Sequence, residues 1–362
     1  MKVVNVNQDR ETDYAQHSVL TNQLSWKSVI TNFLGPSMFN SQKVFLLLKY
    51  FKKYSDISTV VTDLDLSAVV AASMAKKKVI LVTERYGSTI SLIPPKNLKE
   101  AGFKFNNIEI SEIQTAMREL FEWCLNLTDL IVTDCPYDSS LDNNTYFKSL
   151  LDKGKAKFVG PMIRDTTKFS PKTKQEVFSK LGLPVDAILI TASIGGTAMF
   201  IENKKRMQNF YIQVFKKLHN WNPNIRMLLL ARDNDLEVPK GIISLKYLPD
   251  WFSLLQASDL VLAHPGWITV TELSSLRVPS IFCLSSPKEY HEWDEFVRLK
   301  DFGFVTNFNL NERNLLIDAK TLLTSTENRH HLFNNAYQTV APFNNGTETV
   351  SRMIHTIANE RK

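Results

Sequence analysis

The sequence of 362 residues has few cysteines, and their spacing excludes two kinds of architecture. Cys124, Cys135 and Cys283 are odd in number and far apart along the chain. This spacing supplies neither a disulfide framework nor the clustered thiolates of a structural zinc site. We therefore expect a protein with reduced thiols, as found in the cytoplasm.

Long apolar runs are also missing. No stretch reaches the roughly 18 uninterrupted apolar residues that a transmembrane helix needs. The N-terminus becomes polar after one short apolar run (MKVVNVNQDRETDY), unlike the apolar core of a secretory signal. We expect a cytoplasmic protein, and the basic pI of about 9.0 leaves open a peripheral contact at the inner face of the membrane.

The excess of positive charge, +6, is spread along the chain. The basic clusters at 76–78, 204–206 and 216–217 are not interleaved with aromatic residues. Nucleic-acid binding needs a continuous basic stripe or a known module, so we predict no nucleic-acid partner. Solvated helix faces account for the clusters, and an anionic membrane surface or a phosphorylated substrate is compatible with them.

Short apolar segments alternate with longer amphipathic ones along most of the chain. In the first half, strands are predicted at residues 3–6, 59–62, 79–82, 130–133 and 157–159. In the second half they are predicted at residues 187–191, 225–230, 242–245, 260–263 and 280–282. Apolar strands separated by helices form parallel sheets covered on both faces. The predicted fold class is therefore α/β, with two doubly wound, Rossmann-like parallel-sheet domains.

A polar, turn-prone stretch at 164–174 separates the two halves. We expect an N-terminal domain at 1–163, a linker at 164–174 and a C-terminal domain at 175–345. The last helix, within 346–362, is expected to pack back toward the N-terminal domain. Ligands of such sheets bind beyond the carboxyl ends of the strands, so candidate site residues are sought there.

The segment from Leu260 to Glu272 (LVLAHPGWITVTE) carries the most specific pattern. A buried strand is predicted to end at His264, Gly266 permits a tight turn, and a helix follows. Free N–H groups and the dipole at a helix N-terminus favour a diphosphate. Thr269 and Glu272 share a helix face, which suits a phosphate contact by Thr269 and a ribose diol at Glu272. The alternative is an ordinary turn with a core histidine and a surface glutamate.

Two further loops follow strands at the same predicted edge. Gly195 and Gly196 allow a phosphate or sugar to approach the backbone, and Thr197 offers a hydroxyl group. His291 and Glu292 begin a later helix, where they suit sugar hydroxyls. The alternatives are a simple glycine turn and a solvated acidic helix start.

Together these segments resemble the C-terminal domain of nucleotide-sugar glycosyltransferases with the GT-B architecture. The resemblance is to glycosyltransferase family 28, which includes the bacterial lipid II-forming N-acetylglucosaminyltransferase, and to archaeal relatives. The family pattern His/Ser-x-Gly-x-x-Thr-x-x-Glu, followed by Gly-x-Pro, is matched by His264, Gly266, Thr269, Glu272 and Pro279. The family's glycine-rich loop is matched by Gly195, Gly196 and Thr197. In its Glu-Gln-x-x-Asn stretch, Glu292 replaces the glutamine and Glu295 the asparagine, which leaves the donor sugar open.

The resemblance is weaker toward the N-terminus. Arg164 matches an arginine of the family's hinge that lies near the nucleotide. An equal alternative is that Arg164 is a structural hinge residue that pairs with a neighbouring carboxylate. Family members open with a strand and a Gly-x-Gly-His loop, whereas the first glycine here is Gly35. We therefore expect the first strand, loop and helix to be missing or diverged, which leaves the N-terminal domain incomplete.

The general base is left unassigned among four candidates. They are Asp63, Asp65, Glu84 and His17, of which the two aspartates precede a predicted helix at 67–74. A capping aspartate is the simpler interpretation of that pair.

The resemblance implies a metal-independent, hexosyltransferase-type glycosyltransferase. It would move a sugar from a nucleoside diphosphate donor, which the resemblance implies is UDP-linked, to an acceptor hydroxyl, and it would need no cofactor. The acceptor is left open among lipid-linked, glycan and small-molecule compounds. The alternatives are a non-catalytic nucleotide-sugar-binding subunit, a chain that works with a separate N-terminal partner subunit, and a nucleotide-sugar epimerase of the same fold.

Overall fold

The computed structural model describes the chain from residue 41 to residue 359, with gaps. The described residues are 41–87, 91, 94–100, 105–142, 145–163, 172–194, 201–230, 237–246, 248, 250–285, 293–324 and 326–359. They belong to two α/β units, one formed by Met1–Met162 with Asn345–Lys362 and the other by Ile163–Asn344. The strand predicted at 3–6 lies outside the described residues.

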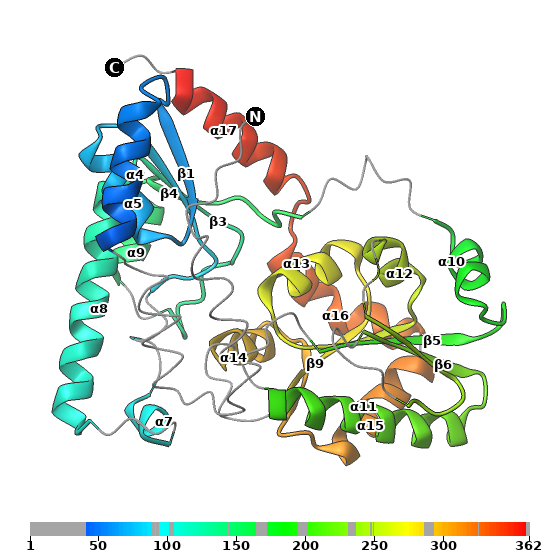
Figure 1. The fold of residues 1–362 in the computed structure, drawn as a ribbon. Coiled ribbons are helices and arrows are strands. Elements are labelled where there is room, and N and C mark those ends of the chain that lie inside the picture. The colour runs from blue at the N-terminus through cyan, green and yellow to red at the C-terminus, as the bar shows by residue number, and fades with distance from the viewer. Residues whose placement is uncertain are drawn as a thin grey trace. The chain divides into compact units, whose positions relative to one another are not determined.

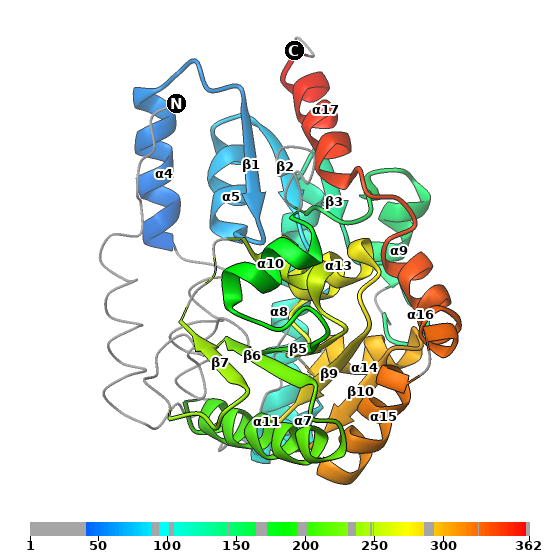
Figure 2. The same cartoon turned by 90° about the vertical axis from the view of Figure 1, so that its right-hand side faces the viewer.

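The first unit contains a parallel sheet in the order β1–β2–β3–β4. Its strands are β1 (Thr59–Asp63), β2 (Lys78–Val82), β3 (Leu130–Thr133) and β4 (Ala156–Phe158). Its helices are α4 (Ser41–Lys53), α5 (Leu66–Met74), α7 (Pro95–Glu100), α8 (Asn107–Leu127), α9 (Thr145–Asp152) and α17 (Gly346–Asn359). Helix α5 covers β1 and β2 from one face, and α17 covers them from the other (Figures 1 and 2).

Helix α17 packs on the first sheet although it comes from the end of the chain. Val350 joins the core cluster of Ile80, Leu130, Val132 and Val159, and Met353, Ile354 and Ile357 pack against it. The helix starts at Gly346, where a Cβ atom would lie 2.4 Å from the Pro161 carbonyl oxygen. Only glycine fits this close approach between two backbone segments.

The second unit contains a parallel sheet in the order β10–β9–β8–β5–β6–β7. Its strands are β5 (Ile188–Ser193), β6 (Ile225–Leu230), β7 (Ile242–Leu245), β8 (Leu260–Ala263), β9 (Ser280–Leu284) and β10 (Val305–Phe308). Its helices are α10 (Lys174–Leu181), α11 (Ile201–Trp221), α12 (Trp251–Ala257), α13 (Trp267–Leu276), α14 (Trp293–Asp301), α15 (Glu312–Thr324) and α16 (Thr326–Val340).

The strand order of the second sheet reverses between β5 and β8. The chain builds β5, β6 and β7 outward to one edge, then returns to β8 beside β5 and proceeds through β9 to β10. A reversal of this kind leaves a crevice outside the carboxyl ends of the two central strands, because the connecting helices leave in opposite directions. The predicted α/β class with two parallel sheets is confirmed.

No helix of the described ranges combines the length and the apolar character needed to cross a bilayer.

Candidate functional site

The turn between β8 and α13 presents an uncapped helix N-terminus. Strand β8 is buried throughout, and α13 begins at Trp267, three residues after His264. The N-cap residue is Gly266, with φ −62° and ψ 130°, and as a glycine it has no side chain to cap the helix by a hydrogen bond. The first N–H groups of α13 therefore receive no acceptor from the N-cap side chain, and they lie at the positive end of the helix dipole.

Glycine at position 266 is required neither by the backbone nor by its neighbours. Its φ and ψ values are accessible to any residue, and a Cβ atom built there would meet no other atom within 4 Å among the residues that the structure describes. Space is thus available immediately beside the free N–H groups. A ligand that approached the backbone would need this space.

This turn lies at the topological switch point of the second sheet. Strand β5 pairs with β8 in parallel, and the last pair in register joins Ala192 to Leu262. Each strand ends one residue after this pair, β5 at Ser193 and β8 at Ala263. The crevice expected between them is therefore bordered by His264 and Gly266 from β8. His264, Gly266 and Thr269 are each half-buried.

Glu272 is almost fully buried, with 3% of its surface exposed. The indole Nε1 of Trp251 donates a hydrogen bond of 2.9 Å to its Oε2 atom. Trp251 is the first residue of α12, whose N-cap Asp250 accepts from the backbone N–H of Ser253. The alternative of a surface glutamate is wrong, because Glu272 is buried and its carboxylate is hydrogen-bonded to Trp251 of α12.

The hydrogen bond between Trp251 and Glu272 was not predicted from the sequence. The sequence does contain a signal for such a bond: a tryptophan follows an aspartate at a helix start, and a buried indole N–H usually has a hydrogen-bond acceptor. Its partner, however, lies 21 residues away on another helix.

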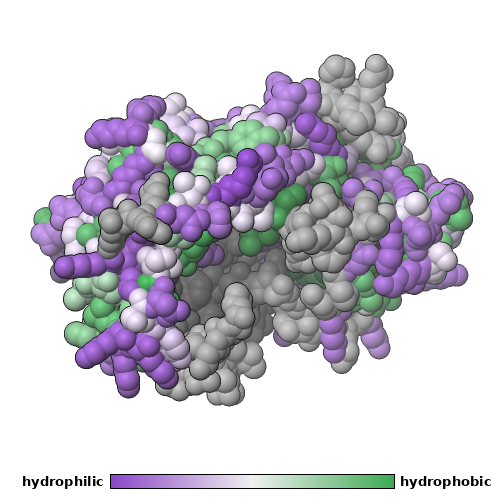
Figure 3. Space-filling view, turned by 90° about the horizontal axis from the view of Figure 1, so that it is seen from above, coloured by the Kyte–Doolittle hydropathy of each residue, from purple (hydrophilic) through white to green (hydrophobic). Residues whose placement is uncertain are grey.

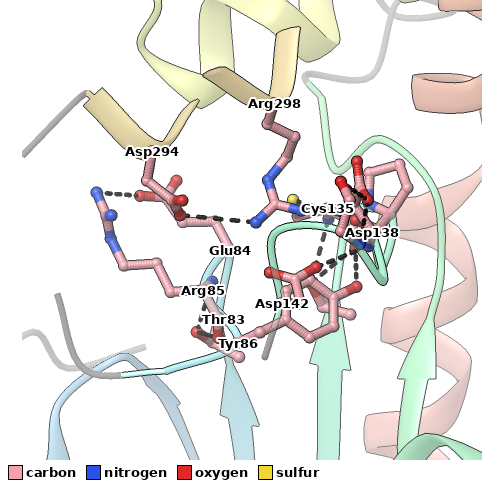
Figure 4. Close-up of polar contacts among 12 residues, drawn as sticks. Thr83, Glu84, Arg85, Tyr86, Cys135, Asp138, Asp142, Asp294 and Arg298 are labelled. Carbon is pink, nitrogen blue, oxygen red and sulfur yellow. Dashed lines mark hydrogen bonds and ion pairs between the residues drawn. The ribbon is translucent and has the colours of Figure 1, made fainter. Parts of the chain in front are cut away.

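The carboxyl edge of the first sheet repeats a short pattern that the sequence analysis also missed. Valine, threonine and an acidic residue follow one another where three strands end, at positions 61–63, 82–84 and 132–134. The Thr83 hydroxyl accepts from Arg85 N and donates to Arg85 O, both at 3.0 Å, and Thr133 accepts from Cys135 N at 3.1 Å (Figure 4). Val82 pairs with Val132, so Glu84 and Asp134 stand at the same level beyond adjacent strands.

Three of the general-base candidates can be compared at this edge. Asp65 caps α5 by accepting from Ser67 N and Ala68 N, and it forms an ion pair with Lys43, which confirms its capping role. Asp63 ends β1 and keeps an exposed side chain, while partial desolvation raises the pKa of its carboxyl group. The Glu84 carboxylate lies 3.6 Å from the Arg85 guanidinium (Figure 4).

Several predicted site residues lie outside the described residues. They are His17, Arg164, Gly195, Gly196, Thr197, His291 and Glu292. Of the acidic helix start, Glu295 is described, and it is 7% exposed on α14. Its neighbour Asp294 lies 3.6 Å from the nearly buried Arg298 on the same helix. Glu295 is therefore not part of a solvated surface. Among the residues that the structure describes, no group of three or more His, Cys, Asp or Glu side chains is arranged to hold a metal ion.

The two parallel-sheet α/β units define the GT-B fold, and similar solved structures share it. The chain is similar to the glycosyltransferase of kitacinnamycin, with TM-score 0.59 and 14% identity over 91% of this chain and 84% of that one. It is similar to MnaA of S. aureus in a structure with UDP, with TM-score 0.57 and 14% identity over 95% and 87% of the two chains. It is also similar to MurG of Acinetobacter baumannii, with TM-score 0.52 and 14% identity over 87% and 79%. No protein-family model and no curated protein matches the sequence.

Proposed function

We propose that this protein is a metal-independent glycosyltransferase that binds a UDP-linked sugar at the carboxyl edge of the second sheet. The observation that carries the proposal is the uncapped N-terminus of α13 at the switch point between β5 and β8. A dianionic diphosphate placed there would accept hydrogen bonds from free N–H groups at the positive end of the dipole.

The same contacts account for catalysis of sugar transfer. Negative charge grows on the diphosphate as its bond to the sugar breaks, and fixed N–H donors stabilise that charge without reorganisation. The open space beside Gly266 admits the phosphates, and Gly195, Gly196 and Thr197 are proposed to contact them from the β5 side. Arg164, His291 and Glu292 remain proposed donor contacts. The UDP in the structure of the similar MnaA supports the choice of nucleotide.

Glu272 is proposed to accept hydrogen bonds from the ribose diol. Its buried carboxylate is held by the Trp251 indole, which fixes the orientation that a bidentate contact requires. A ribose is thus proposed to bind between the start of α12 and α13.

The general base is proposed to come from the first unit. Asp63 and Glu84 are the two described candidates with solvent-accessible carboxylates, and a raised pKa at Asp63 is favourable for proton abstraction near neutral pH. Asp65 is not proposed as the base, because its carboxylate caps α5 and pairs with Lys43. The acceptor hydroxyl stays open among lipid-linked, glycan and small-molecule compounds.

A test is the release of UDP from a panel of UDP-sugars, with and without candidate acceptors and with EDTA present. Acceptor-dependent release that survives EDTA is the expected result. Acceptor-independent conversion of the sugar would instead identify an epimerase. Binding of UDP-sugar with neither reaction would identify a non-catalytic subunit. Asp63→Asn and Glu84→Gln, with Asp56→Asn as an exposed control from the same unit, would show which carboxylate the transfer needs.

A further inference from the structure

A groove of about 630 Å³ lies in the first unit between α17 and the amino ends of the strands. This is the edge of the sheet opposite to the carboxyl edge at which Asp63 and Glu84 lie. Lys78 begins β2, Asp129 precedes β3, and Gly154 forms the left-handed turn before β4, with φ +71°. The groove is separate from the proposed nucleotide site, which belongs to the second unit.

The lining of the groove combines an apolar wall with a positively charged rim. Leu130 from β3 and Met353 and Ile357 from α17 contribute the apolar wall. Lys78, Lys157 and Arg352 contribute three positive charges, and Asp129 contributes one negative charge. The volume is within the range of small-molecule sites.

The charges of the rim are only partly neutralised by the protein. The carboxylate of Asp129 neutralises Lys78: its two oxygens accept hydrogen bonds from Lys78 Nζ at 3.0 Å and from Val79 N at 2.8 Å. Arg352 is 67% exposed and lies 3.9 Å from Glu348, a weak contact within one helix. Among the described residues Lys157 forms no ion pair, and it is exposed. Two cations from different elements, one on β4 and one on α17, thus face the groove without a strong partner.

We propose that this groove binds a small organic phosphate, a phosphate monoester with an apolar body. The guanidinium group of Arg352 and the ammonium group of Lys157 can both donate hydrogen bonds to a dianionic phosphate. The apolar wall of Leu130, Met353 and Ile357 can contact the apolar body of the ligand. Where the described residues are coloured in the view from above, hydrophobic side chains lie in small groups among hydrophilic ones (Figure 3). Because the ligand would join β4 to α17, it would hold the last helix against the sheet.

Hexyl phosphate is the probe that tests this site, titrated calorimetrically at low ionic strength. Saturable binding is expected, at least tenfold tighter than binding of inorganic phosphate, since burial of several methylene groups adds affinity. Lys157→Gln and Arg352→Gln should each lower the affinity about tenfold or more, because each removes a charged donor. Lys153→Gln, an exposed lysine at the same edge outside the groove, should change it less than threefold.

A second measurement tests whether the ligand lies between β4 and α17. Hexyl phosphate should slow amide hydrogen exchange in α17, and it should leave UDP binding by the second unit unchanged. The proposal is overturned by no binding at millimolar concentration, by equal losses in all three variants, or by unchanged α17 exchange at saturation. It is also overturned if vesicles containing phosphatidic acid bind while hexyl phosphate does not, since that result would assign the face to a membrane.

Discussion

The indole Nε1 of Trp251 donates a 2.9 Å hydrogen bond to Oε2 of Glu272, which joins the start of α12 to the buried face of α13. The contact gives the glutamate two separable roles, one in stability and one in the proposed ribose contact. Glu272→Gln retains an acceptor for the indole, so its free energy of unfolding should fall by no more than about 1 kcal/mol. Glu272→Ala leaves the indole N–H without an acceptor and should cost about 1–3 kcal/mol.

The nucleotide affinity of the same variants tests the ribose role. A hydrogen bond to a charged group contributes roughly 1.5–3 kcal/mol, so Glu272→Gln should bind UDP about ten- to a hundredfold more weakly. Trp251→Phe removes the indole donor and keeps the carboxylate, so it measures how much the orienting hydrogen bond contributes to stability and to UDP affinity. Chemical denaturation and UDP titration of the variants separate the two effects. Unchanged UDP affinity in a folded Glu272→Gln variant would eliminate the ribose contact.

Asp65 should act in stability and not in proton transfer. It caps α5, and loss of an N-cap side chain costs typically about 1 kcal/mol. Asp65→Ala should therefore lower the free energy of unfolding by about that amount, whereas Asp65→Asn retains an acceptor and should lose only part of it. Thermal denaturation measures both changes. A folded Asp65→Asn variant that loses all transfer activity would contradict this assignment and make Asp65 a base candidate again.

Much of the fold could be predicted because its strands are continuous apolar runs between polar turns. The strands at 225–230, 242–245, 260–263 and 130–133 were predicted with the bounds observed. Strand β10 was missed because its sequence, VTNF, is short and half polar. Helix α16 was missed because its first half is polar. The burial of Glu272 depends on the packing of α12 against α13, which local sequence does not encode.

Arg277 occupies a backbone conformation that favours glycine. It is the C-cap of α13 with φ 53° and ψ 41°, in the left-handed region where a Cβ atom is crowded. Arg277→Gly should therefore raise the free energy of unfolding by up to about 1 kcal/mol. Urea denaturation measures the change, and a clear loss of stability would show that contacts of the Arg277 side chain outweigh the backbone strain.

Asp318 gives a pH-dependent prediction. Desolvation of this half-buried residue on α15 raises the pKa of its carboxyl group above the unfolded value. The folded state therefore favours the protonated form, so the ionised carboxylate destabilises the fold at neutral pH, and this penalty fades as the pH falls below the raised pKa. Asp318→Asn should be more stable than the wild type at pH 7, and the difference should shrink on acidification. Melting curves between pH 3 and 7 would contradict this if the difference were constant.

The central claim is that a nucleoside diphosphate binds at the N-terminus of α13, and Gly266→Ala tests it most directly. The backbone at Gly266 accepts alanine, and a Cβ atom meets no atom of the described part of the chain within 4 Å, so the unliganded variant should melt close to the wild type. The added methyl group would occupy the space proposed for the phosphates. Isothermal titration with UDP should give saturable binding to the wild type and at least tenfold weaker binding to Gly266→Ala. Equal UDP affinity of the two proteins, or no binding to the wild type at millimolar UDP, would contradict the claim.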